Sequence, residues 1–168
     1  LKKIQKAFLY CYYDKQETSE IFRKLSNDKS TNFSRYNFFH ANYLKNKNKN
    51  EKAQLLVKQS LKKFPKNLIL NQLYLDLESS KEGNYKNKFD CKKISHNLAE
   101  LFYITANALA SESIYPLSNF YLNLAKFLNP NFTNFDILIA ENFYINNKLI
   151  HAKKTYEKIK LNGKIYDW

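Results

Sequence analysis

The sequence predicts an all-α fold made of repeated antiparallel helical hairpins, and three observations support this class. The chain of 168 residues contains two glycines and three prolines, too few for the tight turns of a β-rich protein. Small and apolar residues recur at helical spacing in YLNLAKFLNP, and the pattern ends at Pro130, which cannot continue a helix. A similar segment, LVKQSLKKFP, ends at Pro65. The length suits one domain with an adequate core.

A repeating unit is visible when positions are counted back from these two prolines. Five of six positions agree in size and polarity, at offsets of 5, 8, 12, 21 and 24 residues, and the sixth pairs Phe102 with Asn37. The matching residues are Ala125, Leu122, Ser118, Leu109 and Ala106 before Pro130, and Ser60, Val57, Ala53, Leu44 and Ala41 before Pro65. A shift of 34 residues from the first set reaches Ala140, Phe143, Ala152, Tyr156 and Ile159. Each unit therefore predicts two antiparallel helices that approach closely through small residues.

The N-terminal part predicts two hairpins. Residues 1–25 place Ala7, Tyr10 and Phe22 at approximately the repeat positions, with a slip of one residue in the turn. Residues 33–65 match the unit closely, and the run KNKNKNEK between their two helices predicts a solvated turn. The proline at the end of the second helix turns the chain into the next unit.

The middle of the chain departs from the repeat. NLILNQLYLDLESS, residues 67–80, predicts a first helix, but no clear second helix follows. Residues 81–93 are polar and contain one of the two glycines, so we expect an irregular loop with one short turn around Phe89. This loop is a candidate joint between two halves of the array.

The C-terminal part predicts two more regular hairpins. Pro116 stands where the first turn of a helix tolerates proline, and Thr133 with Asp136 resembles a capping box, as does Asp14 with Glu17. We therefore expect a single array over 1–168. Its approximate units are 1–32, 33–66, 67–97 with the irregular loop, 98–131 and 132–168.

The 34-residue spacing and these residue classes resemble a tetratricopeptide repeat array, an α-solenoid of stacked helical hairpins. Residues 97–168 are also similar to the C-terminal part of longer bacterial repeat proteins, many of them envelope-associated. The chain contains no methionine and starts directly in a helical pattern, so we expect a fragment or processed piece of such a protein. The resemblance implies a non-catalytic scaffold that binds a peptide or partner protein along a concave face lined by the first helices.

Extending the register of the resemblance to the exposed side of each first helix gives the expected partner-binding residues. They are Arg35, Phe38, Asn42, Lys45, Gln72, Asp76, Tyr103, Asn107, Glu141 and Tyr144. A clamp for a C-terminal carboxylate is not expected, because Phe38 and Tyr103 stand where such clamps need lysine. We expect Phe38, Tyr103 and Tyr144 to be surface aromatics and most other aromatics, including Phe120 and Phe127, to fill the space between helices.

The formal net charge of +13 is the main signal for a different function. A basic surface attracts nucleic acid or anionic membrane. The excess is nearly all lysine, however, and only Arg23 and Arg35 are available as guanidinium forks for guanine or phosphate. Joint enrichment in Lys, Asn, Ile, Phe and Tyr is typical of an AT-rich genome and needs no selection for charge. A module that binds RNA or another polyanion is therefore the alternative, and a protein partner is favoured.

No motif predicts catalysis, a cofactor or a metal site. The histidines His40, His96 and His151 lie at packing positions or helix starts, and no HExxH or serine elbow is present. Cys11 and Cys91 are 80 positions apart and form neither a zinc nor a redox motif, so we expect Cys11 to be a core residue and Cys91 to be a free thiol.

No run reaches the roughly 20 apolar residues of a membrane span, and no signal peptide opens the chain. We expect a soluble protein of the bacterial cytoplasm or periplasm, and an accessory module of a larger enzyme stays open.

Overall fold

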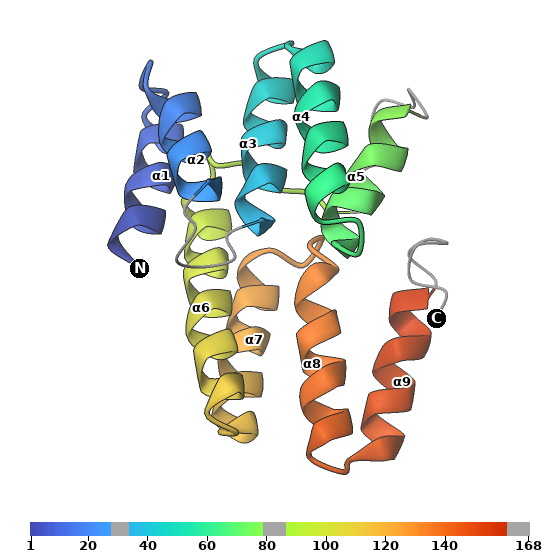
Figure 1. The fold of residues 1–168 in the computed structure, drawn as a ribbon. Coiled ribbons are helices and arrows are strands. Elements are labelled where there is room, and N and C mark those ends of the chain that lie inside the picture. The colour runs from blue at the N-terminus through green and yellow to red at the C-terminus, as the bar shows by residue number, and fades with distance from the viewer. Residues whose placement is uncertain (28–33, 79–86, 161–168) are drawn as a thin grey trace. The chain divides into compact units, whose positions relative to one another are not determined.

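The computed structural model describes residues 1–27, 34–78 and 87–160, and these residues form α-helices joined by short turns (Figure 1). The predicted all-α class is confirmed, since the only β feature in the described ranges is an isolated bridge between Asn87 and Phe132. The helices are α1 (Lys2–Tyr12), α2 (Thr18–Ser26), α3 (Arg35–Asn46), α4 (Asn50–Lys63), α5 (Leu68–Glu78), α6 (Ile94–Ser111), α7 (Tyr115–Leu128), α8 (Asn134–Ile145) and α9 (Leu149–Lys160).

Four helix pairs form antiparallel hairpins, namely α1–α2, α3–α4, α6–α7 and α8–α9 (Figure 1). As predicted, α4 and α7 end two residues before Pro65 and Pro130, and Pro116 lies in the first turn of α7. The predicted first helix of the third unit, 67–97, is α5, and no second helix follows it in the described residues before α6.

The turns inside the four hairpins share one backbone geometry. Each contains a residue with positive φ: Asp14 at 54°, Asn48 at 58°, Ser113 at 62° and Asn147 at 55°. The next N–H donates to the carbonyl five residues back, for example from Lys15 to the Tyr10 oxygen at 2.9 Å, which is the Schellman arrangement of helix C-termini. Asp14 and Asn48 are 34 residues apart, as are Ser113 and Asn147. The repeat seen in side-chain classes is therefore also present in the backbone.

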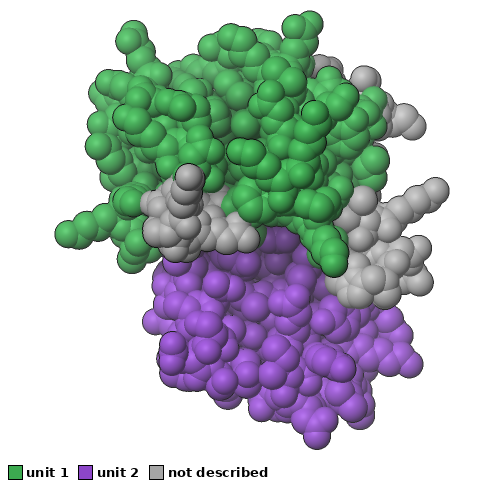
Figure 2. Space-filling view, in the orientation of Figure 1, with its two compact units in different colours: residues 1–85, 89–94 green, residues 86–88, 95–168 purple. Residues whose placement is uncertain are grey.

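The chain divides into two compact units (Figure 2). Unit 1 comprises residues 1–85 and 89–94, and unit 2 comprises residues 86–88 and 95–168. The division falls in the predicted irregular loop, of which residues 81–86 lie outside the described ranges. The described part, 87–93, contains no helix, and its turn lies at Asp90–Lys93 rather than at Phe89. The prediction of one continuous array stays a prediction.

The core of unit 1 is aromatic. The Phe8 ring of α1 lies 6.0 Å from Phe22 of α2 and 5.1 Å from Phe39 of α3. Phe89 is buried with them, 4.5 Å from Phe39, although it lies in the polar segment after α5. Edge-to-face and tilted ring pairs of this kind add to the free energy gained by burial alone. A loop residue therefore completes a helical core.

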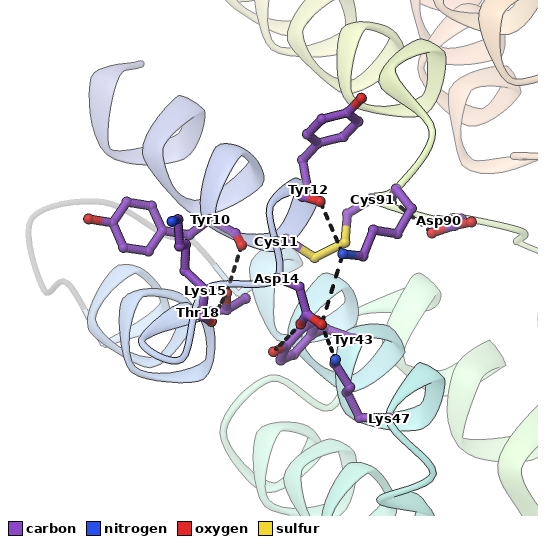
Figure 3. Close-up of a disulfide and its surroundings, with 11 residues drawn as sticks. Tyr10, Cys11, Tyr12, Asp14, Lys15, Thr18, Tyr43, Lys47, Asp90 and Cys91 are labelled. Atoms are coloured by element: carbon purple, nitrogen blue, oxygen red, sulfur yellow. Dashed lines mark hydrogen bonds and ion pairs between the residues drawn. A yellow bond between two sulfur atoms is a disulfide. The ribbon is translucent and has the colours of Figure 1, made fainter.

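A disulfide joins Cys11 of α1 to Cys91, with the two Cα atoms 5.8 Å apart (Figure 3). Both cysteines are buried. The prediction of a free thiol at Cys91 is therefore wrong. The pairing depends on the approach of two segments 80 residues apart, and spacing along the sequence does not reveal that approach.

Asp14 lies near the disulfide and connects the α1–α2 turn to α3 (Figure 3). Its carboxylate accepts hydrogen bonds from Tyr43, at 3.1 Å, and from Lys47, and Lys92 lies 4.0 Å away. The Lys47 hydrogen bond is the main reason that the pKa of Asp14 lies below its usual value. The predicted capping box with Glu17 does not form, since α2 receives no side-chain cap from the described residues.

The second predicted capping box is also absent. Thr133 is the N-cap residue of α8, but its side chain makes no capping hydrogen bond to a described residue. The carboxylate of Asp136 instead accepts a hydrogen bond from Lys126 of α7. Spacing along the sequence alone predicted that Asp14 and Asp136 cap helices. In the structure the carboxylate of each instead accepts a hydrogen bond from a lysine of another hairpin.

Unit 2 has small residues at its helix contacts and one buried polar network. Ala106 of α6 and Ala140 of α8 are fully buried. Asn142 of α8 donates to Ser118 Oγ and to Asn119 Oδ1 of α7, both at 2.8 Å, and Ser118 Oγ donates to the Ala106 carbonyl at 2.8 Å. The network links α6, α7 and α8 and uses buried polar groups that are costly to leave unpaired.

Replacing Asn142 by leucine is expected to lower the free energy of unfolding by about 1–3 kcal/mol, because polar oxygens on α7 lose their donor in a buried site. Chemical denaturation of the variant measures this. Asn123→Leu is the matched control, since the Asn123 side chain is exposed and bonds only within α7, and its effect should stay within about 0.5 kcal/mol. Equal effects at the two sites would contradict the structural role of the network.

Candidate functional site

In unit 1 the first helices of two successive predicted hairpins, α3 and α5, pack against each other. They bring together three of the expected partner-binding residues. Gln72 Nε2 donates to Asp76 Oδ1 on α5 at 2.7 Å, and the Asp76 carboxylate attracts the ammonium of Lys45 on α3. We call Lys45, Gln72 and Asp76 the α3/α5 cluster.

The α3/α5 cluster combines opposite charges in partly desolvated surroundings. Lys45 and Asp76 are both half-buried. Burial lowers the pKa of Lys45, and the nearby Asp76 carboxylate partly offsets this effect. Charges that have lost part of their hydration interact more strongly with a ligand than fully solvated charges do. The cluster can therefore offer both a cation and a carboxylate to a bound polar chain.

Three of the expected surface residues are buried in the structure: Phe38 is 1% exposed, Asn42 3% and Gln72 5%. Their prediction as exposed side chains is wrong. Phe38 and Asn42 lie on α3, which packs against α2, α4 and α5 rather than against one neighbour, and Gln72 lies on α5, which packs against α3 and α4. The Asn42 amide donates to the Phe38 carbonyl at 3.0 Å, within its own helix. Arg35 is half-buried, and its guanidinium lies over the Phe39 ring at 5.5 Å.

In unit 2 the expected residues are more accessible. Tyr103 of α6 is half-buried, with its ring 5.8 Å from Phe135, whereas Asn107 is exposed. Tyr144 is 62% exposed, which confirms it as a surface aromatic. Glu141 is also exposed, yet the surrounding protein removes part of its hydration and raises its pKa. Glu141 and Tyr144, one turn apart on α8, thus form a second accessible pair.

Exposed apolar residues on α7 were not predicted. Phe120 is 56% exposed and Phe127 84%, so the expectation that they fill the core is wrong. The sequence of α7, YPLSNFYLNLAKFL, indicates that some of its apolar side chains are exposed. One of its fourteen residues is charged, so the helix has more apolar side chains than one buried face can hold. The repeat positions Ser118, Leu122 and Ala125 are the residues of α7 that are buried.

Within the ranges 1–27, 34–78 and 87–160, no three His, Cys, Asp or Glu side chains gather closely enough to hold a metal ion. His40 is buried against Phe22, His96 is half-buried, and His151 is exposed beside Phe143. None of the helices in these ranges combines the length and apolar character needed to cross a bilayer.

Comparison with known proteins adds no family assignment. No family model matches the sequence, and neither curated proteins nor solved structures give a significant match. The repeat, the half-buried α3/α5 cluster and the exposed pair Glu141 and Tyr144 are therefore the features that bear on function.

Proposed function

We propose that this chain is a tetratricopeptide-like α-solenoid that acts as a non-catalytic scaffold, binding a peptide or partner protein along the surface of its first helices. The observation that carries the proposal is the α3/α5 cluster, in which first helices of successive hairpins contribute to one polar site. The 34-residue separation of equivalent turns, Asp14 to Asn48 and Ser113 to Asn147, supports the repeat architecture.

The chemistry of the accessible residues suits an extended peptide. A peptide backbone presents donors and acceptors along its whole length. Lys45 and Asp76 of unit 1 can meet both kinds of group, and so can the side-chain amide of Asn107 in unit 2. Tyr144 adds a large side chain that buries area at low entropic cost, as aromatic anchors of interfaces do. Repeat proteins acquire binding specificity from a few such side chains on the surface of a shared helical scaffold.

Selection of a phage-displayed library of random peptides on the immobilised chain tests the proposal. For a selected peptide that binds unit 1, Lys45→Met is expected to weaken binding by about tenfold or more in Kd, measured by calorimetry. For a selected peptide that binds unit 2, the same loss is expected from Tyr144→Ala. Lys45→Met keeps the apolar stem of the half-buried side chain, so the loss reports the charge.

Lys93→Met and Tyr13→Ala are the matched controls, since both side chains are exposed and lie outside the proposed surface. They should leave Kd unchanged. Failure to enrich any peptide, or affinity that survives both Lys45→Met and Tyr144→Ala, would refute the proposed surface.

A further inference from the structure

The outward face of α4 carries a set of lysines that the peptide-binding proposal does not use. Lys52, Lys58, Lys62 and Lys63 are all exposed, whereas Ala53 and other small residues of the helix are buried. None of these four lysines forms an ion pair with a described residue. We call them the α4 lysine face. Glu51 is the sole acidic residue of this helix.

The distribution of charge makes unit 1 the basic part of the protein. Unit 1 contains 19 lysines and arginines and 9 acidic residues, a net charge of +10, and unit 2 contains 9 and 6, a net charge of +3. Most of the positive field therefore surrounds the unit to which α4 belongs. Unpaired lysines on one helix of a strongly positive unit attract an anionic surface.

The composition of α4 distinguishes between anionic partners. The helix contains no arginine and no aromatic residue, so it offers neither bidentate phosphate clamps nor platforms for base stacking. Leu55, in contrast, is 56% exposed on the same helix as the lysines. Lysines are attracted to an anionic membrane surface, and an exposed leucine among them can add a small apolar area that enters the interface.

The disulfide supplies an independent argument. Disulfides persist in oxidising compartments such as the periplasm or the extracellular space and are rare in the cytosol. The Cys11–Cys91 bond therefore favours an oxidising compartment over the cytosol, which contains most of the cell's nucleic acid.

From these observations we infer that the α4 lysine face binds the headgroups of an anionic phospholipid bilayer, with Leu55 entering the interface. The attraction is electrostatic and distributed over the lysines, since each ammonium acts as a point charge rather than as part of a pocket. Binding leaves the α3/α5 cluster available, because that cluster lies on different helices.

Co-sedimentation with vesicles of equal parts phosphatidylglycerol and phosphatidylcholine tests the inference. A quadruple variant of the α4 lysine face, each lysine changed to glutamine, is expected to bind these vesicles more weakly by about 600-fold, since each of the four lysines near an anionic surface contributes a factor of about 5. Glutamine has a helix propensity close to that of lysine, so α4 should persist, and circular dichroism checks this.

The matched control changes four exposed lysines that are scattered over both units, Lys2, Lys15, Lys93 and Lys153, to glutamine. It removes the same net charge and should lose much less binding. Wild-type binding is expected to fall as salt rises, since the Debye length shrinks from about 10 Å at 0.1 M to about 3 Å at 1 M.

Three results would overturn the inference. The first is no binding of the wild type to anionic vesicles at low salt, and the second is an equal loss in the two quadruple variants, which would indicate net charge alone. The third is displacement of the protein from vesicles by a single-stranded oligonucleotide that it binds more tightly, which would identify nucleic acid as the partner of this face.

Discussion

Removing the Cys11–Cys91 disulfide is expected to lower the free energy of unfolding of unit 1 by about 2–5 kcal/mol. The bond closes a loop over a separation of 80 residues, and a cross-link of that length strongly restricts the unfolded chain. It also holds the segment around Phe89 against α1, where the Phe89 ring lies 5.6 Å from Phe8. The loss should therefore affect the aromatic core of unit 1.

The double variant Cys11→Ala, Cys91→Ala is the appropriate test, because both side chains are buried and alanine adds no buried hydroxyl. Hydrogen exchange measured by mass spectrometry should show faster exchange in α1 and α3, and urea denaturation should give a lower midpoint. A phosphine reductant should destabilise the wild type by a similar amount and leave the double variant unchanged. Stability that is indifferent to reductant would contradict the cross-link.

Acidification is expected to destabilise unit 1 through His40. This imidazole is 7% exposed, its ring is stacked on Phe22 at 5.8 Å, and neither nitrogen has a hydrogen-bond partner among the described residues. Burial lowers the pKa of His40 to about 4 from the ordinary value of 6.5. Between these two values the unfolded chain binds a proton that the folded chain does not, so stability falls as pH falls.

The contribution of His40 is fully present above pH 6.5 and is lost progressively as pH decreases to about 4, with a total of about 3 kcal/mol. His40→Phe keeps an aromatic ring of similar size and cannot be protonated. Urea denaturation at a series of pH values should therefore show a flatter pH dependence for this variant than for the wild type. The difference between the two curves isolates His40 from the carboxylates, which titrate in both proteins.

His151→Phe is the matched control for this experiment, since His151 is exposed and lies beside another aromatic ring, that of Phe143. Its pH dependence should match that of the wild type. If His40→Phe and His151→Phe change the curve equally, or if neither changes it, the buried neutral state of His40 is contradicted.

Much of the fold could be predicted from the sequence, because helices produce patterns among residues that are close together along the chain. The spacing of small and apolar residues predicted the hairpins, and Pro65, Pro116 and Pro130 marked their ends and starts correctly. The sequence also predicted that no regular second helix follows residues 67–80, since the next segment is polar and contains glycine. Each of these features depends on neighbours within a few positions along the chain.

The candidate surface was predicted less well, because register identifies the side of a helix but not what covers it. Phe38 and Asn42 were expected on the exposed side of α3, yet both are buried, and α3 packs against α2, α4 and α5. Phe127 has the apolar character of a core residue, yet it is 84% exposed. Asp14 and Asp136 had the spacing of helix caps, but their carboxylates interact with lysines from other helices.

The sequence by itself determined the all-α class, the hairpins and the 34-residue repeat, because helical periodicity and turn residues are properties of short segments. Only the tertiary structure decided that Cys11 pairs with Cys91 and that His40 is buried without a hydrogen-bond partner among the described residues. It also decided that the α4 lysines form no ion pair within the described ranges. Each of these features depends on which segments, distant along the chain, come into contact in the folded protein. Their energies depend on burial and distance, which a linear pattern does not specify.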